Sequence, residues 1–412
     1  ATMSRSVSNA GTRLAGFGHR WLPFADAASA DLSLSRLLRL SLFQFSTGMA
    51  IVLLTGTLNR IMVVELGQPA SWVSLMLAIP LLMAPARALI GYRSDHHRSF
   101  LGWRRIPYLW SGTMMQFGGL AFMPFALILM IEPHSGPELL GPAAAMASFL
   151  LTGLGMHVAQ TAGLALATDL ATEETRPRVV ALLYLMLLIG MVGSALIFAA
   201  LLEDFGYVRL IQVIQSAAVI TLVLNVVAML KQEARRPDLT DHSLARPTFG
   251  NAWRDFISLP KARPLLWALG LGTMGFTMQD ILLEPYGAQV LGLSVSDTTL
   301  LTAMFASGMI LALILTSRRL DKGSDPIRVA STGVLIGITA FAFVILSAPF
   351  QAPALFQVGA ALIGLGNGLF AVGMLTAAMV FGGDKMAGLT LGAWGAVQAA
   401  AAGVAMFSGG AI

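Results

Sequence analysis

The sequence predicts an all-α protein that crosses a membrane many times. Of the 412 residues, 56% are apolar and only 11% are charged, and the mean hydropathy is +0.75. Apolar blocks of about 20 residues or more, the length that a membrane-spanning α-helix needs, follow one another to the end of the chain. Nearly every Lys and Arg lies in alternate connections between these blocks. Together these three observations exclude a soluble globular protein.

Charge clusters and Gly or Pro residues divide the apolar sequence into eleven predicted crossings. They lie at 38–64, 71–91, 106–131, 141–168, 178–202, 207–230, 264–286, 297–317, 327–348, 353–380 and 386–412. With the N-terminus in the cytoplasm, only Arg60 and Arg209 of the 26 Lys and Arg lie towards the opposite side. The bias therefore predicts a cytoplasmic N-terminus, and both exceptions need a partner.

The predicted crossings fall into two halves. Residues 1–36 form a cytoplasmic N-terminal segment, 37–230 a six-helix half, 231–263 a polar cytoplasmic connector, and 264–412 a second half with five helices. Weak similarity between 153–157 and 364–368 suggests duplication. Parallel repeats of this kind predict a major facilitator fold, which has six plus six helices. A twelfth helix is therefore expected beyond Ile412.

Five polar residues are predicted to meet between the halves. Asn59 and Arg60 lie in the first crossing, and Gln279, Asp280 and Glu284 lie at similar depth in the seventh. An unpaired charge at this depth costs on the order of 3 kcal/mol, so we expect Arg60 to pair with Asp280 or Glu284. Such a pair is either a static tie between the halves or a charge switch of a proton-coupled carrier.

His157 lies near the middle of the fourth crossing, with Gln160 on an adjoining face. A neutral imidazole at this depth can hydrogen-bond between helices, carry a proton, or serve as an axial ligand to the magnesium of a chlorin. Composition alone favours the hydrogen-bonding role. No other residue is a candidate metal ligand.

The second connection carries Gly91, Asp95, Arg104 and Arg105, a pattern like the facilitator loop that ties the inner helix ends together. We interpret these four residues as structural. The glycines of the last crossing, Gly388, Gly392, Gly395 and Gly403, allow close helix packing, either internally or against a docked partner helix.

Several classes of function are excluded by missing motifs. The chain has no phosphate-binding loop, nucleophile elbow or zinc-binding helix, so it is not predicted to be an enzyme. It has no Cys, and no basic soluble domain for nucleic acid. A secondary transporter and a membrane assembly factor that reuses a transporter fold remain.

Six segments resemble one family closely. They are Trp21–Ala28, Arg36–Gln44, Gly56–Leu66, Trp103–Tyr108, His157–Asp169 and Gln279–Gly287. They are similar to the PucC/LhaA family, also called the bacteriochlorophyll delivery family, of the major facilitator superfamily. The resemblance covers essentially the whole chain.

The resemblance implies an assembly factor for purple-bacterial light-harvesting antenna complexes that binds or delivers bacteriochlorophyll. It implies a bacterial inner, photosynthetic membrane. The expected partners are antenna polypeptides, the reaction-centre core complex and membrane lipid, with carotenoid or lipid as further ligands. His157 then becomes an axial ligand to pigment magnesium, with Gln160 beside it. The alternative is a proton-coupled secondary transporter of a small solute.

Overall fold

The computed structural model describes residues 32–83, 87, 90, 94, 102–131, 137–172, 175–234, 258, 261–321 and 323–411. Within these ranges the regular structure is entirely helical. Eight described segments are long and apolar enough to cross a membrane, which confirms a multi-pass, all-α membrane protein. The exact number of eleven crossings stays a prediction.

The helices before the connector include one broken first crossing and five later helices. Their bounds are α2 Leu34–Leu40, α3 Leu42–Ile51, η2 Val52–Leu58, η3 Ile61–Glu65, α4 Ala70–Leu82, α6 Ile106–Ile131, α7 Leu140–Leu170, α8 Arg176–Leu201 and α9 Tyr207–Met229. The predicted crossing at 71–91 is described as a helix only up to Leu82, and most of its remainder lies outside the described residues.

The first crossing is not a uniform α-helix. Ser33 caps α2 by accepting a hydrogen bond from the Arg36 amide at 3.4 Å. Both η2 and η3 are π-helical, with hydrogen bonds from each amide to the fifth residue before it. π-Helical turns are rare and often occur at functional sites, and they change which side chains share a face.

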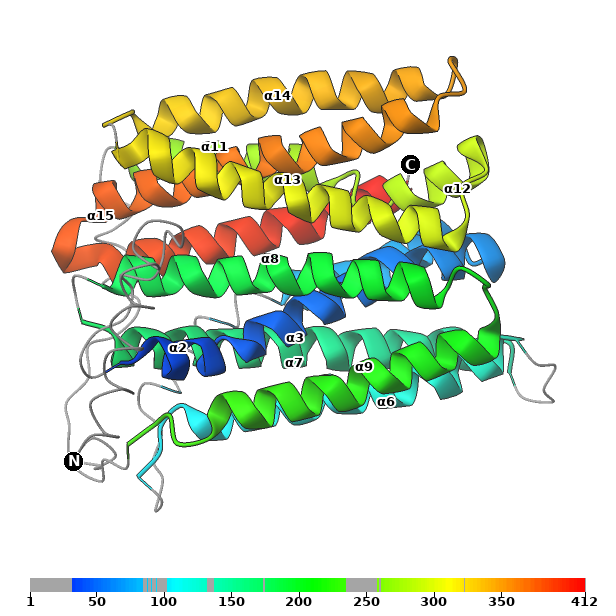
Figure 1. Ribbon diagram of the computed structural model, residues 1–412, viewed down its shortest axis with the longest axis horizontal. Coiled ribbons are helices and arrows are strands. Elements are labelled where there is room, and N and C mark those ends of the chain that lie inside the picture. The colour runs from blue at the N-terminus through cyan, green and yellow to red at the C-terminus, as the bar shows by residue number, and fades with distance from the viewer. Residues whose placement is uncertain are drawn as a thin grey trace, which may run out of the picture.

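The helices after the connector form a second group. Their bounds are α11 Ala262–Thr277, α12 Leu283–Leu291, α13 Val295–Asp321, α14 Pro326–Ser347 and α15 Pro353–Ala411. The crossing predicted at 264–286 is not one continuous helix, because the helix breaks between α11 and α12. Pro285 contributes to the break, since it has no amide to bond the carbonyl of Ile281, four residues earlier. The two last predicted crossings are both contained in α15, whose orange and red parts run as separate lengths in Figure 1.

The two groups pack side by side along their whole length (Figure 1). Helix α8 contacts α13, and α4 contacts the last part of α15. A Cβ placed on Gly403 would lie 3.0 Å from the Leu82 amide, so Gly403 serves internal packing. A Cβ on Gly395 would meet nothing within 4 Å, whereas the surroundings of Gly388 and Gly392 lie outside the described side chains. One buried apolar cluster includes Leu58 and Ala303 and therefore joins both groups.

Candidate functional site

The first polar cluster joins the first crossing to the break between α11 and α12. Asn59 donates a hydrogen bond from Nδ2 to the carbonyl of Ile281, with an N–O distance of 3.0 Å. This is the carbonyl that Pro285 leaves without an intrahelical donor. The two crossings therefore do contact each other as predicted, and the contact is a hydrogen bond from the neutral side-chain amide of Asn59.

Arg60 does not make the predicted pair with Asp280 or Glu284. Its Nη1 lies 2.5 Å from Oε1 of Glu65, on the same crossing, and only 5% of Arg60 is exposed. Residues five apart point to different faces of an α-helix but approach one another in a π-helical register. The π-helical segment η3 thus provides a local partner. Among the described residues Arg60 makes no ion pair with Asp280 or Glu284, although it lies within electrostatic reach of Glu284.

Glu284 is buried between the two groups of helices, with 3% of its surface exposed. Thr302 of α13 donates to its Oε1 at 2.6 Å, while Oε2 has no hydrogen-bond partner among the described residues. A Cβ placed on Gly56 of η2 would lie 2.6 Å from Oε1, so the carboxylate occupies the space that a side chain would take. A buried carboxylate with one free oxygen is a group that can accept a proton.

Gln279 and Asp280 bond mainly to each other in the break. Gln279 Nε2 donates to Asp280 Oδ1 and also to the carbonyl of Phe276, at 3.2 Å in the second case. These two residues and Glu284 therefore have separate partners and do not form one carboxylate pair. Sequence reasoning missed Thr302 and Gly56, although a glycine one turn before Asn59 was a visible signal of close approach.

The second polar cluster lies within the first group of helices. His157 of α7 is 8% exposed, and its Nδ1 has no hydrogen-bond partner among the described residues. Gln160 donates to Oε1 of Gln44 in α3 at 3.2 Å. Thr161 donates to the His157 carbonyl at 2.7 Å and accepts from Arg87 Nε at 3.2 Å.

Arg87 is the residue of this cluster that sequence reasoning missed. It lies inside the span predicted at 71–91, which was the signal available in the sequence. The structure places its guanidinium against α7, and His157 and Tyr184 of α8 lie within electrostatic reach of it.

The surroundings of His157 do not fit a bacteriochlorophyll macrocycle. The free Nδ1 suits an axial ligand to magnesium. However, a Cβ placed on Gly153 would lie 2.5 Å from Cβ of Pro80, so α7 touches α4 one turn before His157. We therefore derive no step through a pigment at this residue.

A groove of about 450 Å³ lies between α8, α13 and α15. Val192 and Leu196 line it from α8, Ser307 and Leu311 from α13, and Ala361 from α15. Leu196 is 51% exposed and Leu311 48% exposed, so the groove is open at the surface. Its lining is almost entirely apolar, as expected of a recess that faces lipid or another membrane helix.

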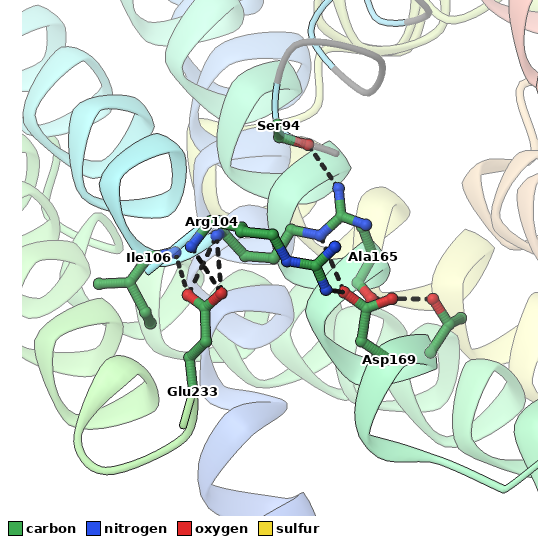
Figure 2. Close-up of polar contacts among 8 residues, drawn as sticks. Ser94, Arg104, Ile106, Ala165, Asp169 and Glu233 are labelled. Atoms are coloured by element: carbon green, nitrogen blue, oxygen red, sulfur yellow. Dashed lines mark hydrogen bonds and ion pairs between the residues drawn. The ribbon is translucent and has the colours of Figure 1, made fainter. Parts of the chain in front are cut away.

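A third polar cluster ties helix ends together at the end of the molecule that carries Arg104 and Arg105, which we call the basic end. Arg105 donates from Nη1 to Ser94 Oγ at 2.6 Å and from Nε to Asp169 Oδ2 at 3.0 Å. Ser94 and Asp169 are labelled in Figure 2. Arg104 Nη2 lies 3.5 Å from the same Asp169 oxygen. These contacts agree with a structural role for both arginines. Gly91 and Asp95 lie outside the described residues.

Two solved transporters have the same fold. A bacterial homologue of the human lysosomal transporter Spinster, in an inward-facing and unoccupied conformation, matches with a TM-score of 0.66 and 16% identity, covering 90% of this chain and 81% of that one. A D-xylose–proton symporter matches with a TM-score of 0.64 and 16% identity, covering 90% and 88%. At this identity the likeness concerns the fold alone, and it confirms the predicted major facilitator fold.

The sequence itself has much closer relatives. Protein PucC of Rhodovulum sulfidophilum is 53% identical over 414 residues, which cover 99% of this chain and 91% of that protein. The family model described as PUCC protein matches residues 57–412. The chain therefore belongs to the PUCC protein family.

Proposed function

We propose that this protein is an assembly factor for light-harvesting antenna complexes of purple bacteria, and that it binds or delivers bacteriochlorophyll to antenna polypeptides in the membrane. The observation that carries the proposal is the 53% identity to protein PucC over nearly the whole chain. The fold supports it as well, because a multi-pass protein presents long apolar faces to the membrane helices of a client.

The groove between α8, α13 and α15 is the surface that we assign to an antenna polypeptide, as a single membrane helix. Ala303, Ser307 and Ala361 are small, so the backbone of a client helix can approach closely there. Exposed Leu196 and Leu311 flank these small residues and would cover the sides of the client helix. The reaction-centre core complex is a further partner of the proposal, and carotenoid or lipid are further ligands.

The proposed location is the bacterial inner, photosynthetic membrane, with the N-terminus in the cytoplasm. The basic end carries Arg36, Arg104, Arg105, Arg318 and Arg319, and this bias supports a cytoplasmic basic end.

The first test is gentle purification from phototrophically grown membranes, followed by an absorption spectrum and mass spectrometry of what copurifies. Near-infrared bacteriochlorophyll bands together with antenna polypeptides are the expected result. A colourless protein without antenna polypeptides would contradict the proposal.

The groove is tested with Ser307→Trp, which fills the recess from an exposed position on α13. We expect antenna copurification to fall several-fold, because an indole excludes the client helix from the small residues. Ile338→Trp, at a 63% exposed position on α14 outside the groove, is the matched control. Equal copurification by the two variants would remove the groove from the proposal.

The alternative function is proton-coupled transport of a small solute. The buried, half-partnered Glu284 favours it, because this carboxylate lies between the two groups of helices and can accept a proton. Uptake into proteoliposomes that is driven by a pH gradient and abolished by Glu284→Gln would support transport. The assembly proposal predicts that Glu284→Gln leaves antenna levels in cells close to normal.

A further inference from the structure

Arg87 is a cation inside the first group of helices with no carboxylate partner. Its Nε donates to Thr161 Oγ1 at 3.2 Å, and this is its hydrogen bond among the described residues. Within the same residues no Asp or Glu lies within ion-pair distance of Arg87. Guanidinium groups in membrane helices are costly and normally pair or face a functional pathway. The remaining donors of this planar fork are therefore available to a ligand.

A side chain near Arg87 is also incompletely bonded. Nδ1 of His157 is buried without a hydrogen-bond partner among the described residues. Tyr184 of α8 lies within electrostatic reach of the guanidinium, and so does His157. The segment that carries Arg87 and the helices α7 and α8 thus bring polar groups into one region. Natural proteins rarely leave a buried polar group unsatisfied.

The cluster lies within the membrane-spanning bundle and is partly exposed. Thr161 precedes the end of α7 at Leu170 by a rise of roughly 14 Å, which places it within the membrane-spanning part of that helix. Arg87, Thr161 and Tyr184 are half-buried, whereas His157 is buried. The half-buried side chains are the ones that a ligand can reach.

We propose that Arg87 is the centre of a binding site for the carboxylate of an otherwise apolar molecule. The guanidinium fork matches a carboxylate in a bidentate arrangement, and the Tyr184 hydroxyl supplies a further donor. One carboxylate neutralises the one positive charge, so the pair of guanidinium and carboxylate has no net charge in a low-dielectric surrounding. A phosphodiester of a bilayer lipid has the same charge, but its place at the membrane surface disfavours it at this depth.

The test is a binding measurement on the full chain in phosphatidylcholine nanodiscs. The probes are dansyl-labelled undecanoic acid and the matching dansyl-labelled undecanol, with empty nanodiscs as the blank. We expect the acid to bind at least about tenfold more tightly than the alcohol, as charge-assisted hydrogen bonds imply. Arg87→Gln should remove that ratio and leave alcohol binding unchanged. Arg87→Lys keeps the charge without the fork and should retain part of the ratio.

Two controls keep the result decisive. Arg209→Gln changes an exposed arginine, with 47% of its side chain exposed, and should leave the ratio intact. Thr161→Val removes the hydrogen-bond partner of Arg87 and keeps the charge. This variant replaces Arg87→Gln in the test if Arg87→Gln does not fold. A lower ratio of acid to alcohol affinity in Thr161→Val supports the site. Equal binding of acid and alcohol to the unchanged protein would overturn the proposal. Displacement of the acid by phosphatidylglycerol in the nanodisc would reassign the site to a lipid phosphate.

The inference does not depend on antenna assembly, because it concerns one cation and its neighbours. If antenna polypeptides do not copurify but the acid still binds more tightly than the alcohol, only the proposed function is contradicted. If antenna polypeptides copurify but acid and alcohol bind equally, only the carboxylate site is contradicted.

Discussion

Gly56 and Glu284 make a close contact at the boundary between the helix groups. The Glu284 carboxylate occupies the volume that a side chain at position 56 would fill, and a Cβ there would also lie 3.0 Å from Thr302 Oγ1. Neither neighbour can withdraw easily, because Glu284 is buried and bonded to Thr302 at 2.6 Å. At this residue the lack of a side chain is therefore a packing requirement.

Gly56→Ala is predicted to destabilise the protein by about 1–3 kcal/mol, the usual cost of overpacking a buried contact. Thermal unfolding in nanodiscs measures the effect as a lower Tm. Gly275→Ala is the control, because a Cβ at that position on α11 meets nothing within 4 Å. It should be neutral or slightly stabilising, since Ala favours helix more than Gly does. Equal Tm values for both variants would contradict the assigned contact.

The N-terminus of helix α6 is capped by one side chain from a distant segment. Glu233, beyond the end of α9, accepts hydrogen bonds from the backbone amides of Arg104, Arg105 and Ile106 at 2.7, 3.0 and 2.9 Å (Figure 2). These amides have no intrahelical acceptor at a helix start, and a negative charge there is also favoured by the helix dipole. The α6 N-terminus is thus capped by the far end of the same helix group.

Glu233→Ala is expected to cost about 1–2 kcal/mol, as the loss of a helix cap does. Hydrogen exchange should increase at the amides of Arg104, Arg105 and Ile106 and stay unchanged in the middle of α6. Glu203→Ala, at an exposed position between α8 and α9, is the matched carboxylate control. Unchanged exchange at the three amides in Glu233→Ala would show that the cap is not formed.

Among the described residues, three regions of contact join the two helix groups. Two are helix pairs, α8 with α13 and α4 with α15. The third lies around the break before α12, where Asn59 bonds Ile281 and Thr57 Oγ1 lies 3.5 Å from Thr299 Oγ1. A rocking motion of one group against the other, as in transporters of this fold, has to break this third contact.

Asn59→Ala is predicted to loosen the contact and to cost about 1–2 kcal/mol, because the Ile281 carbonyl loses its donor. The chain has no native Cys, so spin labels at Val208→Cys and Val290→Cys report the separation of the groups directly. Both positions are exposed, at 72% and 41%. The distance distribution should broaden in Asn59→Ala and remain narrow in Thr55→Ala, whose hydroxyl bonds only the Ile51 carbonyl. No change in Asn59→Ala would exclude a role in joining the groups.

The all-α, membrane-crossing fold could be predicted from the sequence because its signals are local. The length of an apolar run is set by bilayer thickness, and every backbone polar group within it must bond inside its own helix. Prediction of the major facilitator fold and of the family was also correct. Arg104 and Arg105 were singled out from a pattern within one connection, whereas their partners Asp169 and Glu233 lie on other segments.

The tertiary structure alone decided the partners of the buried polar groups. Arg60 pairs with Glu65 because of a π-helical register, which a regular apolar run does not reveal. Asn59 reaches Ile281, and Arg87 reaches Thr161, across gaps in sequence that no local period encodes. Side-chain pairing depends on which helix faces meet in three dimensions. Composition and spacing therefore determined the membrane-crossing, all-α fold of this protein, and packing determined which partners its described buried charges meet.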